Sequence, residues 1–533
     1  MRTMRTLLIN GIVHTPADPG ATAVLIEGDA IGWIGHEGAA IAHADGVDRV
    51  IDVAGGLITP AFVDAHVHIT TTGMHLRGLD LSGARSAADV LRLTAAHCQE
   101  QPPGTIVLGH GWDETTWPDP ALPQRQQLDV AAAGLAVYLT RVDVHSALAS
   151  SEMLALTPGV QDLPGFDATG LLQADAHHAA RSAVLERIPT QQRQALIDEA
   201  LQTWAAAGVA AVQEMAGPEI SNSTDVTELI KRSQKATGPE ISVYWGELGG
   251  AARAKAMGAV GAGGDLFADG SLGSHTAYLS SHYADVLDDR GAPYVVAAEV
   301  RDHVLECVAE QIQAGFHAIG DQALTEVLEG FSAAAEVVGL DRIRLGRHRI
   351  EHVEMPTGRH IQQIAALGIT ASMQPLFEQM WGGPDGMYTQ RLGPERVQRM
   401  NPYGDLAAAG VAMAFGSDSP VAPISPWATV RAAMQHRTPG AALTARAAFS
   451  AHTRGGWRAI GRDDSGVLQP GAPATLAVWE CQELSVQRPD DRVARWSTDP
   501  RSGTPVLPVL ADDLPLPETM LTMRSGGIIY ERA

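Results

Sequence analysis

The middle of the chain alternates short strand-like segments with longer amphipathic ones whose apolar residues recur at helical spacing. The segments that read as strands are 57–69, 209–214, 266–268, 314–319, 347–353, 368–373 and 411–416, and those that read as helices are 193–207, 300–313, 322–338, 357–367 and 426–435. Repetition of strand and helix in this order predicts a parallel sheet, either doubly wound or closed into a barrel. The pattern alone leaves these two architectures open.

Both ends of the chain are rich in short strand-like segments separated by turns. Before residue 58 these segments are 7–14, 23–27, 30–35 and 50–53, and near the end of the chain they are 476–480 and a hairpin over 520–531. Such segments, bounded by Gly, Asp and Ser, are typical of β-hairpins. We therefore expect one small β-sandwich built from residues 1–58 and 459–533, with two unrelated edge hairpins as the alternative.

Between these ends we expect a barrel over residues 59–458 that carries an insertion. From about residue 72 to residue 190 the alternation gives way to loops rich in Trp, Pro, Gly and His, among them Trp112 and Trp117. An insertion of this kind can lie over the barrel mouth as a lid and supply apolar walls to a site.

Charge and cysteine content exclude several classes of protein. The chain has 38 Lys+Arg against 61 Asp+Glu, a formal net charge of −23, and no basic cluster. Nucleic acid and anionic membranes are therefore not expected partners, and strongly anionic substrates are mildly disfavoured. No apolar run reaches the about 18 residues of a membrane helix, and the N-terminus lacks a secretion signal. The three cysteines form no CxxC pair, which fits a reducing cytoplasm.

Residues that bind metals recur where the predicted strands end. His66 and His68 close the first strand, and alternate residues of a strand face the same way, so both imidazoles can bind one metal. His317, His352 and Asp418 close three later strands. Any one of these side chains could equally be a core or surface residue. Strand ends of an α/β barrel converge on one mouth, so together the five predict a single metal site.

These segments resemble the motifs of the amidohydrolase superfamily. The resemblance is carried by LITPAFVDAHVH (57–68), FADGSLGSHTA (267–277), HAIGD (317–321), HRIEH (348–352), MQP (373–375) and FGSDSP (415–420). More narrowly, the chain resembles the amidohydrolase family 3 branch, which includes N-substituted formamide deformylase. The resemblance spans nearly the whole chain and implies a distorted (β/α)₈ TIM barrel with metal at its mouth.

The resemblance also implies a role for each metal-type residue. His66 and His68 would hold the more buried metal, and His317 and His352 the second one. Asp418 would bind the first metal, take a proton from the bridging water and pass it to the leaving amine. We expect one or two divalent ions, with zinc preferred and iron or manganese as alternatives.

One position departs from the superfamily pattern. In many members a carboxylated lysine bridges the two metals, in the motif Lys-x-Phe-x-Asp-Gly-Ser, whereas Asp265 stands at the lysine position here. Lys231, Lys235 and Lys255 lie in segments remote from that strand end, so no carboxylated lysine is expected. Asp265 either bridges two cations after a local shift of its strand or leaves the site with one tightly held metal. A solvated loop position for Asp265, with Asp269 as the backup ligand, is the remaining alternative.

The leading function is hydrolysis of a C–N bond, in a small amide, N-formyl compound or cyclic amide, by metal-activated water. The alternatives are a mononuclear deaminase, an ester or carbamate hydrolase, and a catalytically idle binding protein. Trp112 and His145 of the insertion and Gln374 at a strand end are the predicted substrate-binding residues. The partner expected is a small-molecule substrate, and the sequence is compatible with a homo-oligomer.

Overall fold

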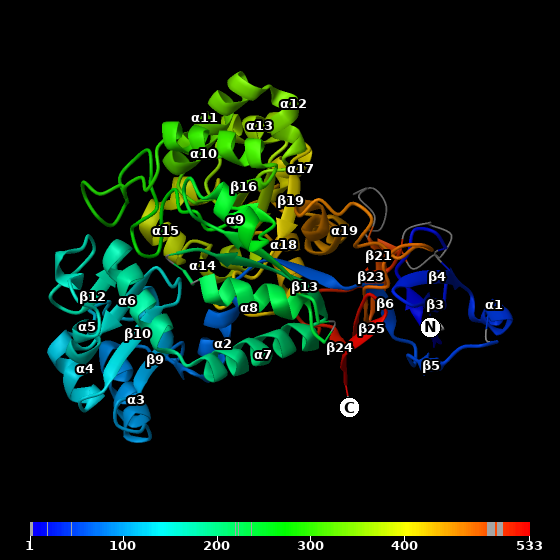
Figure 1. The fold of residues 1–533 in the computed structure, drawn as a ribbon, viewed down its shortest axis with the longest axis horizontal. Helices are drawn as coiled ribbons and strands as arrows, with labels where there is room; N and C mark the ends of the chain where they lie inside the picture. Colours follow the sequence, from blue (N-terminus) through cyan, green and yellow to red (C-terminus); the bar gives the residue numbers. More distant parts are fainter. Residues whose placement is uncertain are drawn as a thin grey trace.

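Eight parallel strands form the central sheet of the molecule (Figure 1). The computed structural model describes residues 4–18, 20–43, 45–218, 220–221, 223–235, 237–487, 496–497 and 505–532. Part of the predicted domain range 459–533 therefore lies outside the described residues. In the order in which they lie side by side, the strands are β7 (Phe62–Val67), β13 (Val209–Ala216), β14 (Glu240–Trp245), β15 (Gly261–Ala262), β16 (Gln313–Ala318), β17 (Arg349–His352), β18 (Thr370–Met373) and β19 (Ala412–Phe415).

The sheet closes between its two edge strands. Val67, the last residue of β7, pairs in parallel with Ser419 beyond β19. The N–H of Asp418 donates to the carbonyl oxygen of His66 at 2.8 Å, and the N–H of His68 donates to that of Ser419 at 3.0 Å. These contacts make the sheet a barrel rather than a doubly wound open sheet.

Helices cover the outside of the barrel, and their buried side chains form one apolar cluster with the strands. The main helices are α2 (Ile69–Arg77), α7 (Thr190–Ala206), α8 (Ser223–Ser233), α9 (Ala251–Met257), α10 (Ala297–Glu310), α11 (Asp321–Val338), α12 (Leu340–Leu345), α13 (Gly358–Leu367), α14 (Pro375–Trp381), α15 (Met387–Leu392), α17 (Tyr403–Ala408), α18 (Pro426–Met434) and α19 (Ala445–Ser450). The five helices read from the sequence correspond to α7, α10, α11, α13 and α18, with small shifts at their ends.

Two barrel strands differ from the sequence prediction, which lacks β14 and places the next strand at 266–268. The ladder runs instead through β15, and Phe267 keeps only an isolated bridge to β16. Gly263 (φ +141°) and Gly264 (φ +81°) turn the chain out of the ladder. A Cβ at Gly263 would lie 2.2 Å from the carbonyl oxygen of Gly315, so glycine is needed for this close approach of the two backbones.

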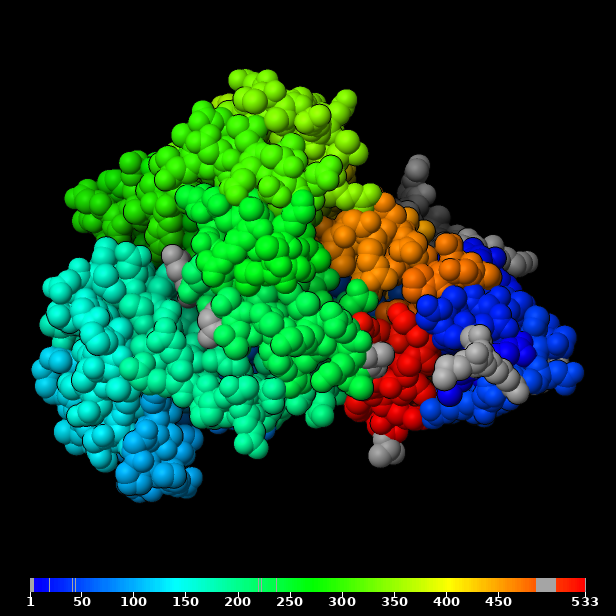
Figure 2. Space-filling model, viewed as in Figure 1, coloured from blue at the N-terminus to red at the C-terminus, as the bar shows by residue number. Residues whose placement is uncertain are grey.

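Strands from both ends of the chain share one sheet. Its five strands lie in the order β2-β6-β20-β24-β25, and a four-stranded sheet with the order β4-β3-β1-β5 packs against it through a common apolar cluster. In Figure 2 the two ends of the chain, blue and red, lie side by side. The strands are β1 (Arg5–Ile9), β2 (Ile12–Val13), β3 (Ala23–Glu27), β4 (Ala30–Gly35), β5 (Arg49–Asp52), β6 (Leu57–Pro60), β20 (Leu476–Glu480), β24 (Glu518–Arg524) and β25 (Gly527–Glu531).

The segment between α2 and α7 folds around a five-stranded sheet of its own, with the order β12-β11-β10-β9-β8 (cyan in Figure 1). Val137 and Tyr138 point to opposite faces of this sheet, and each joins a separate apolar cluster. Its elements are β8 (Leu79–Asp80), α3 (Ala87–Gln99), β9 (Ile106–Trp112), α4 (Arg125–Ala132), β10 (Ala136–Arg141), β11 (Ser146–Ala149), α5 (Ser151–Ala155), β12 (Leu171–Gln173) and α6 (Ala174–Arg187). Within the described part of the chain, no helix has the length and apolar character needed to cross a membrane.

Trp479 of β20 joins the terminal sheet to the barrel, and its removal should destabilise both. Its ring contacts Phe62 and Trp427 edge-on at centroid distances of 5.6 and 5.4 Å, and its indole N–H donates to Thr59 Oγ1 at 2.8 Å. We expect Trp479→Ala to lower the free energy of unfolding by about 3–5 kcal/mol, because it leaves a cavity at this junction. Urea unfolding followed by circular dichroism measures the effect.

The matched control is Val130→Ala, because Val130 is 82% exposed on α4 and its truncation should change the free energy of unfolding by less than about 0.5 kcal/mol. If Trp479→Ala were as mild as this control, the junction would not depend on the indole.

Candidate metal centre

Six histidine and aspartate side chains meet at the C-terminal ends of the barrel strands, and all six are buried. They are His66 in β7 and His68 after it, Asp265 after β15, His317 in β16, His352 at the end of β17, and Asp418 after β19. Their ligand atoms form three overlapping groups in which all atoms lie within 4.8 Å of one another. The structure thus brings together every residue that was predicted as a metal ligand.

Four of these side chains place one atom each at nearly equal separations. Asp265 Oδ2 lies 3.3 Å from His66 Nε2 and 3.2 Å from His68 Nε2. Asp418 Oδ1 lies 3.5 Å from His66 Nε2 and 3.2 Å from His68 Nε2. Ligands held at about 2.1 Å by a tetrahedral ion stand about 3.4 Å apart. The four atoms therefore have the spacing of ligands that share one cation.

The other oxygen of Asp265 faces the remaining two histidines. Oδ1 lies 3.3 Å from His317 Nδ1 and 3.7 Å from His352 Nε2. The carboxylate thus stands between two groups of ligands and turns one oxygen toward each, as a carboxylate that bridges two cations does. With 5% of its surface exposed, Asp265 is not a solvated loop residue.

The backbone explains how so short a side chain reaches the centre of the site. The turn at Gly263 and Gly264 directs the chain out of β15 immediately before Asp265. The end of β14 approaches the same segment closely, since a Cβ at Gly246 would lie 2.9 Å from the carbonyl oxygen of Asp265. This turn brings the Asp265 carboxylate between the two groups of histidines.

Hydrogen bonds to the outer nitrogens orient three of the histidines. Glu351 Oε2 accepts from His66 Nδ1 at 2.9 Å, and Gln374 Oε1 accepts from His352 Nδ1 at 2.9 Å. His317 instead donates from Nε2 to the carbonyl oxygen of Gly270 at 3.2 Å. A neutral imidazole carries one proton, so in each ring the nitrogen that faces Asp265 keeps its lone pair for a metal.

Glu351 occupies a position that simple strand alternation does not give. Alternation predicts that Glu351 and His352 face opposite sides of β17, yet both reach the barrel interior. His352 has φ +71°, so the strand geometry ends there and its side chain turns back toward the mouth. Arg349, also buried, donates to both oxygens of Glu351 at 2.5 and 2.8 Å. This pair fixes the carboxylate that holds His66.

Unpartnered atoms support the presence of a cation at the centre. His66 Nε2, His352 Nε2 and Asp418 Oδ1 are buried and form no hydrogen bond within the described part of the chain. Burial opposes ionisation of Asp265, but the neighbouring His66 and His317 hold the pKa of its carboxyl well below its ordinary value. Buried polar atoms without partners are rare in folded proteins. Nitrogen and carboxylate donors in this arrangement fit divalent ions such as zinc, manganese or iron.

Asp269, the alternative metal ligand considered from the sequence, has a structural role instead. Its carboxylate accepts hydrogen bonds from the backbone N–H groups of Tyr278, Ile319 and Gly320 at 2.8, 3.0 and 2.8 Å. It therefore joins two loops at the barrel mouth, which agrees with the structural role that its Asp-Gly sequence favours.

Of the predicted substrate-binding residues, His145 lies where a substrate could reach it. A cavity of about 60 Å³ beside the metal ligands is lined by His145, and the ring of His145 lies 5.4 Å from that of His317. Trp112 is 1% exposed inside the insertion, where it donates to the carbonyl oxygen of Leu139 at 2.9 Å. Gln374 is committed to His352 and does not line the cavity. The expectation of substrate contact is therefore corrected for Trp112 and Gln374.

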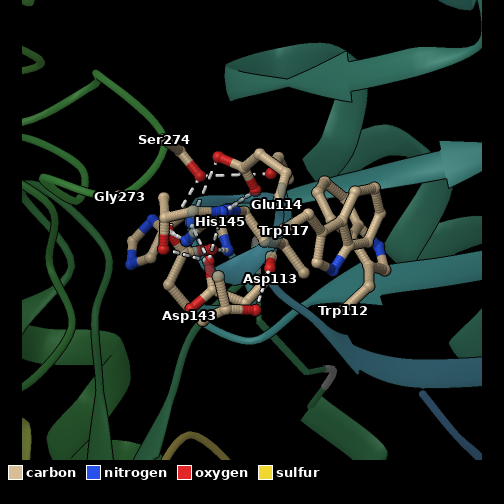
Figure 3. A network of polar contacts seen from close by, with 12 residues as sticks. Trp112, Asp113, Glu114, Trp117, Asp143, His145, Gly273 and Ser274 are labelled. Carbon is tan, nitrogen blue, oxygen red and sulfur yellow. Dashed lines mark hydrogen bonds and ion pairs between the residues drawn. The ribbon is translucent and has the colours of Figure 1, made fainter. Parts of the chain in front are cut away.

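A buried arginine network, which the sequence analysis missed, connects the insertion to the barrel (Figure 3). Arg141 of β10 pairs with Asp113, Glu114 and Asp143 at 3.0, 2.9 and 2.9 Å. Asp143 accepts in turn from Ser274 Oγ of a barrel loop at 2.9 Å.

Figure 3 shows the rings of Trp112 and Trp117 set apart from His145, on the side of the insertion core. Sequence alternation could not have found this network, because the chain turns after Arg141, with Val144 at φ +51° and its N–H donating to the carbonyl oxygen of Arg141 at 3.0 Å.

Comparison with known proteins identifies the family. The sequence profile of the amidohydrolase family matches residues 49–530. The chain belongs to the amidohydrolase family. It is 25% identical over 528 residues to N-substituted formamide deformylase of Arthrobacter pascens, covering 90% of this chain and 94% of that protein. This finding confirms the resemblance that the motifs indicated.

Two further relatives cover much of the chain. The protein LONG AFTER FAR-RED 3 of Arabidopsis thaliana is 26% identical over 422 residues, covering 73% of this chain and 70% of that protein. A crystal structure of an uncharacterized metal-dependent hydrolase from Pyrococcus horikoshii OT3 has a TM-score of 0.70 at 25% identity, covering 92% of this chain and 99% of that one. As an amidohydrolase, the chain is a metal-dependent hydrolase of carbon–nitrogen bonds other than peptide bonds.

Replacing Gln374 should weaken metal binding without touching a ligand. Gln374→Met removes the acceptor that orients His352, so we expect the affinity for the bound metal to fall by about 10- to 100-fold. Gln374→Glu keeps an acceptor at the same place and should retain the affinity. Competition with a chromophoric chelator measures both variants. Equal affinities for Gln374→Met and the unmodified protein would show that His352 needs no orienting partner.

Proposed function

We propose that this amidohydrolase cleaves the amide C–N bond of a small N-acyl compound, with N-formyl compounds as the first class to examine, at a centre that holds two divalent ions. The observation that carries the proposal is the position of the Asp265 carboxylate, with one oxygen toward His66 and His68 and the other toward His317 and His352. The similarity to N-substituted formamide deformylase over 90% of the chain supports the N-formyl class.

The ligands divide into two sets around Asp265. His66, His68 and Asp418 would hold one ion together with Asp265, and His317 and His352 would hold the other together with the same carboxylate. Divalent ions in such a site lower the pKa of water toward neutrality and so supply a nucleophile at ordinary pH.

Asp418 is the proton carrier in this proposal. One of its oxygens faces His66 and His68, and the residue lines the same cavity that would receive the amide. A carboxylate in that position can accept a proton from the attacking water and deliver it to the departing nitrogen. No other carboxylate of the described chain lines this cavity apart from Asp265, which stands between the two ligand sets.

His145 is proposed to bind the carbonyl oxygen of the substrate. Burial and the nearby His317 lower the pKa of His145 to about 3, so its imidazole is neutral and offers one N–H. A donor aimed at an oxygen that gains negative charge during the reaction stabilises the transition state. The Asp143 carboxylate accepts from the backbone N–H of His145 at 3.2 Å and holds this segment in place.

The domain arrangement belongs to the same proposal. Residues 1–58 and 459–533 would act as a β-sandwich that supports the barrel of residues 59–458. The insertion at about 72–190 would act as the lid, because His145 and other residues of the insertion line the cavity beside the metal ligands.

Metal content tests the bridging role of Asp265. We expect about two equivalents of divalent metal per chain in protein purified without chelator, and one or fewer in Asp265→Ala, with at least about a 100-fold loss of kcat. Elemental mass spectrometry and hydrolysis of N-formyl amines measure the two quantities. Asp341→Ala, on the exposed surface of α12, should change neither. Full metal content and activity in Asp265→Ala would refute the bridge.

Asp418→Asn tests the proton carrier. The amide side chain cannot take up a proton, so kcat for amide substrates should fall by about 10²- to 10⁴-fold. Matched esters have leaving groups that need less protonation, so their hydrolysis should fall less. A loss of the same size for amides and esters, at unchanged metal content, would argue against proton delivery to nitrogen. Hydrolysis of esters alone by the unmodified protein would place the reaction in the ester class instead.

A further inference from the structure

The cavity beside the metal centre has a guanidinium group among its walls. Most of its walls away from the metal side are apolar, with Met74, Leu108, Val184 and Leu185 among them. Arg181, on α6 of the insertion, is the one Lys or Arg among the described residues that line it. A cation in such a wall requires an explanation, because a charge is costly to place beside apolar surface unless it is paired.

Arg181 has no acidic partner in the part of the chain that the structure describes. Its Nη2 lies 3.3 Å from the carbonyl oxygen of Val144 and 2.8 Å from His177 Nε2. His177 Nε2 is itself 2.7 Å from the same carbonyl oxygen, and its Nδ1 is 2.9 Å from the hydroxyl of Tyr138. The partners of Arg181 in the described chain are therefore neutral groups, a carbonyl oxygen, an imidazole and the hydroxyl of Tyr138, and none of them is a carboxylate.

Arg181 is partly buried, and the arginines that are more deeply buried in this fold all have acidic partners. Each is less than 9% exposed and pairs with at least one carboxylate: Arg141 with Asp143 at 2.9 Å, Arg193 with Asp225 at 2.5 Å, Arg349 with Glu351 at 2.5 Å, and Arg391 with Asp285 at 2.6 Å. The fold thus supplies a carboxylate wherever it buries a guanidinium for structural reasons. Arg181, which is partly exposed to the cavity that it lines, has no such carboxylate among the described residues.

A second cavity adjoins the one beside the metal centre. It has a volume of about 510 Å³ and shares Met74, Leu108 and Val184 as walls with the first. Arg187, six residues beyond Arg181 on α6, lines this second cavity, and its guanidinium donates to the carbonyl oxygens of Ala183 and Leu156. Arg187 therefore carries a positive charge on the same helix but outside the cavity beside the metal centre.

We propose that Arg181 binds a carboxylate carried by the substrate on the side remote from the scissile amide, so that the substrate class is N-formyl or other N-acyl derivatives of amino acids whose apolar chain spans the cavity. The proposal rests on the amide hydrolysis proposed above. A guanidinium is a planar cation with five N–H donors, and its paired N–H groups match the two oxygens of a carboxylate. A substrate with one carboxylate carries a single negative charge, so the negative net charge of the chain does not prevent it from binding.

The test compares acids with their uncharged carboxamides. The substrates are N-formyl aminoalkanoates of increasing chain length and the corresponding carboxamides, and the proteins are the unmodified enzyme, Arg181→Gln and Arg181→Lys. We expect kcat/KM for the best acid to exceed that of its carboxamide by about 30-fold or more. Arg181→Gln should abolish this preference, chiefly through KM, and leave the carboxamide within about threefold of the unmodified enzyme. Arg181→Lys should retain part of the preference, because it keeps the charge but not the paired donors.

Arg187→Gln is the matched control, because it removes a positive charge from the same helix but outside the cavity beside the metal centre. It should change the acid-to-carboxamide ratio by less than about threefold. An acid preference that survives Arg181→Gln, an unmodified enzyme without any acid preference, or equal loss of both substrates in Arg181→Gln would each overturn the proposal.

A binding measurement separates failure of this proposal from failure of the proposed reaction. Free aminoalkanoates should raise the Tm of the metal-loaded unmodified protein and not that of Arg181→Gln, whereas the carboxamides should raise neither. If no amide is hydrolysed but this difference in Tm appears, the reaction is wrong and the carboxylate site stands. If amides are hydrolysed but acids and carboxamides behave alike in both assays, the reaction stands and the carboxylate site is wrong.

Discussion

The seam between β7 and the segment after β19 is the contact on which the site depends. It joins residues that are about 350 positions apart in the chain, through the bridge between Val67 and Ser419 and the two backbone bonds beside it. Asp64 reinforces the seam, because its carboxylate accepts from the backbone N–H of Ser417 at 2.7 Å and from the hydroxyl of Ser417 at 2.6 Å. Without this closure His66 and Asp418 would face solvent on opposite edges of an open sheet. The contacts that close the barrel therefore also bring the metal ligands together.

The second constraint is electrostatic. The mouth of the barrel places several carboxylates close together in a buried space. A carboxylated lysine delivers its bridging group on a long flexible side chain, whereas an aspartate must be brought to the centre by the backbone. The turn at Gly263 and Gly264 does this, and it explains why β15 is so short. The cost of burying Asp265 is offset by four histidine nitrogens around it and by the cations that this donor set can hold. The backbone turn thus brings the short Asp265 side chain to a position that a lysine would reach through its longer side chain.

Sequence reasoning reaches the parts of this site that depend on periodicity. The spacing of His66 and His68, and the placement of His317 and Asp418 near strand ends, follow from alternation and barrel convergence, and the structure brings all of them together. Sequence reasoning fails where the local backbone departs from strand alternation, as at His352. Because His352 has a φ of +71°, its side chain and that of Glu351 both face inward. Sequence reasoning also fails for Trp112, because an aromatic residue beside a loop looks the same in sequence whether it lines a cavity or, as here, packs inside an independent cluster.

The two halves of the cavity come from units that fold around separate apolar clusters. The barrel supplies the metal ligands from rigid strand ends, while the insertion supplies His145 and Arg181 from its own sheet and helix. The buried network of Arg141 and Arg391 fixes one unit on the other, since Glu114 of the insertion binds both guanidinium groups and Arg391 also donates to the carbonyl oxygen of Gly273. The metal ligands and most of the other cavity walls therefore come from different segments, which one set of ion pairs holds together. A change in the insertion can alter which substrate fits without disturbing the ligands, which is how one barrel serves many C–N bonds.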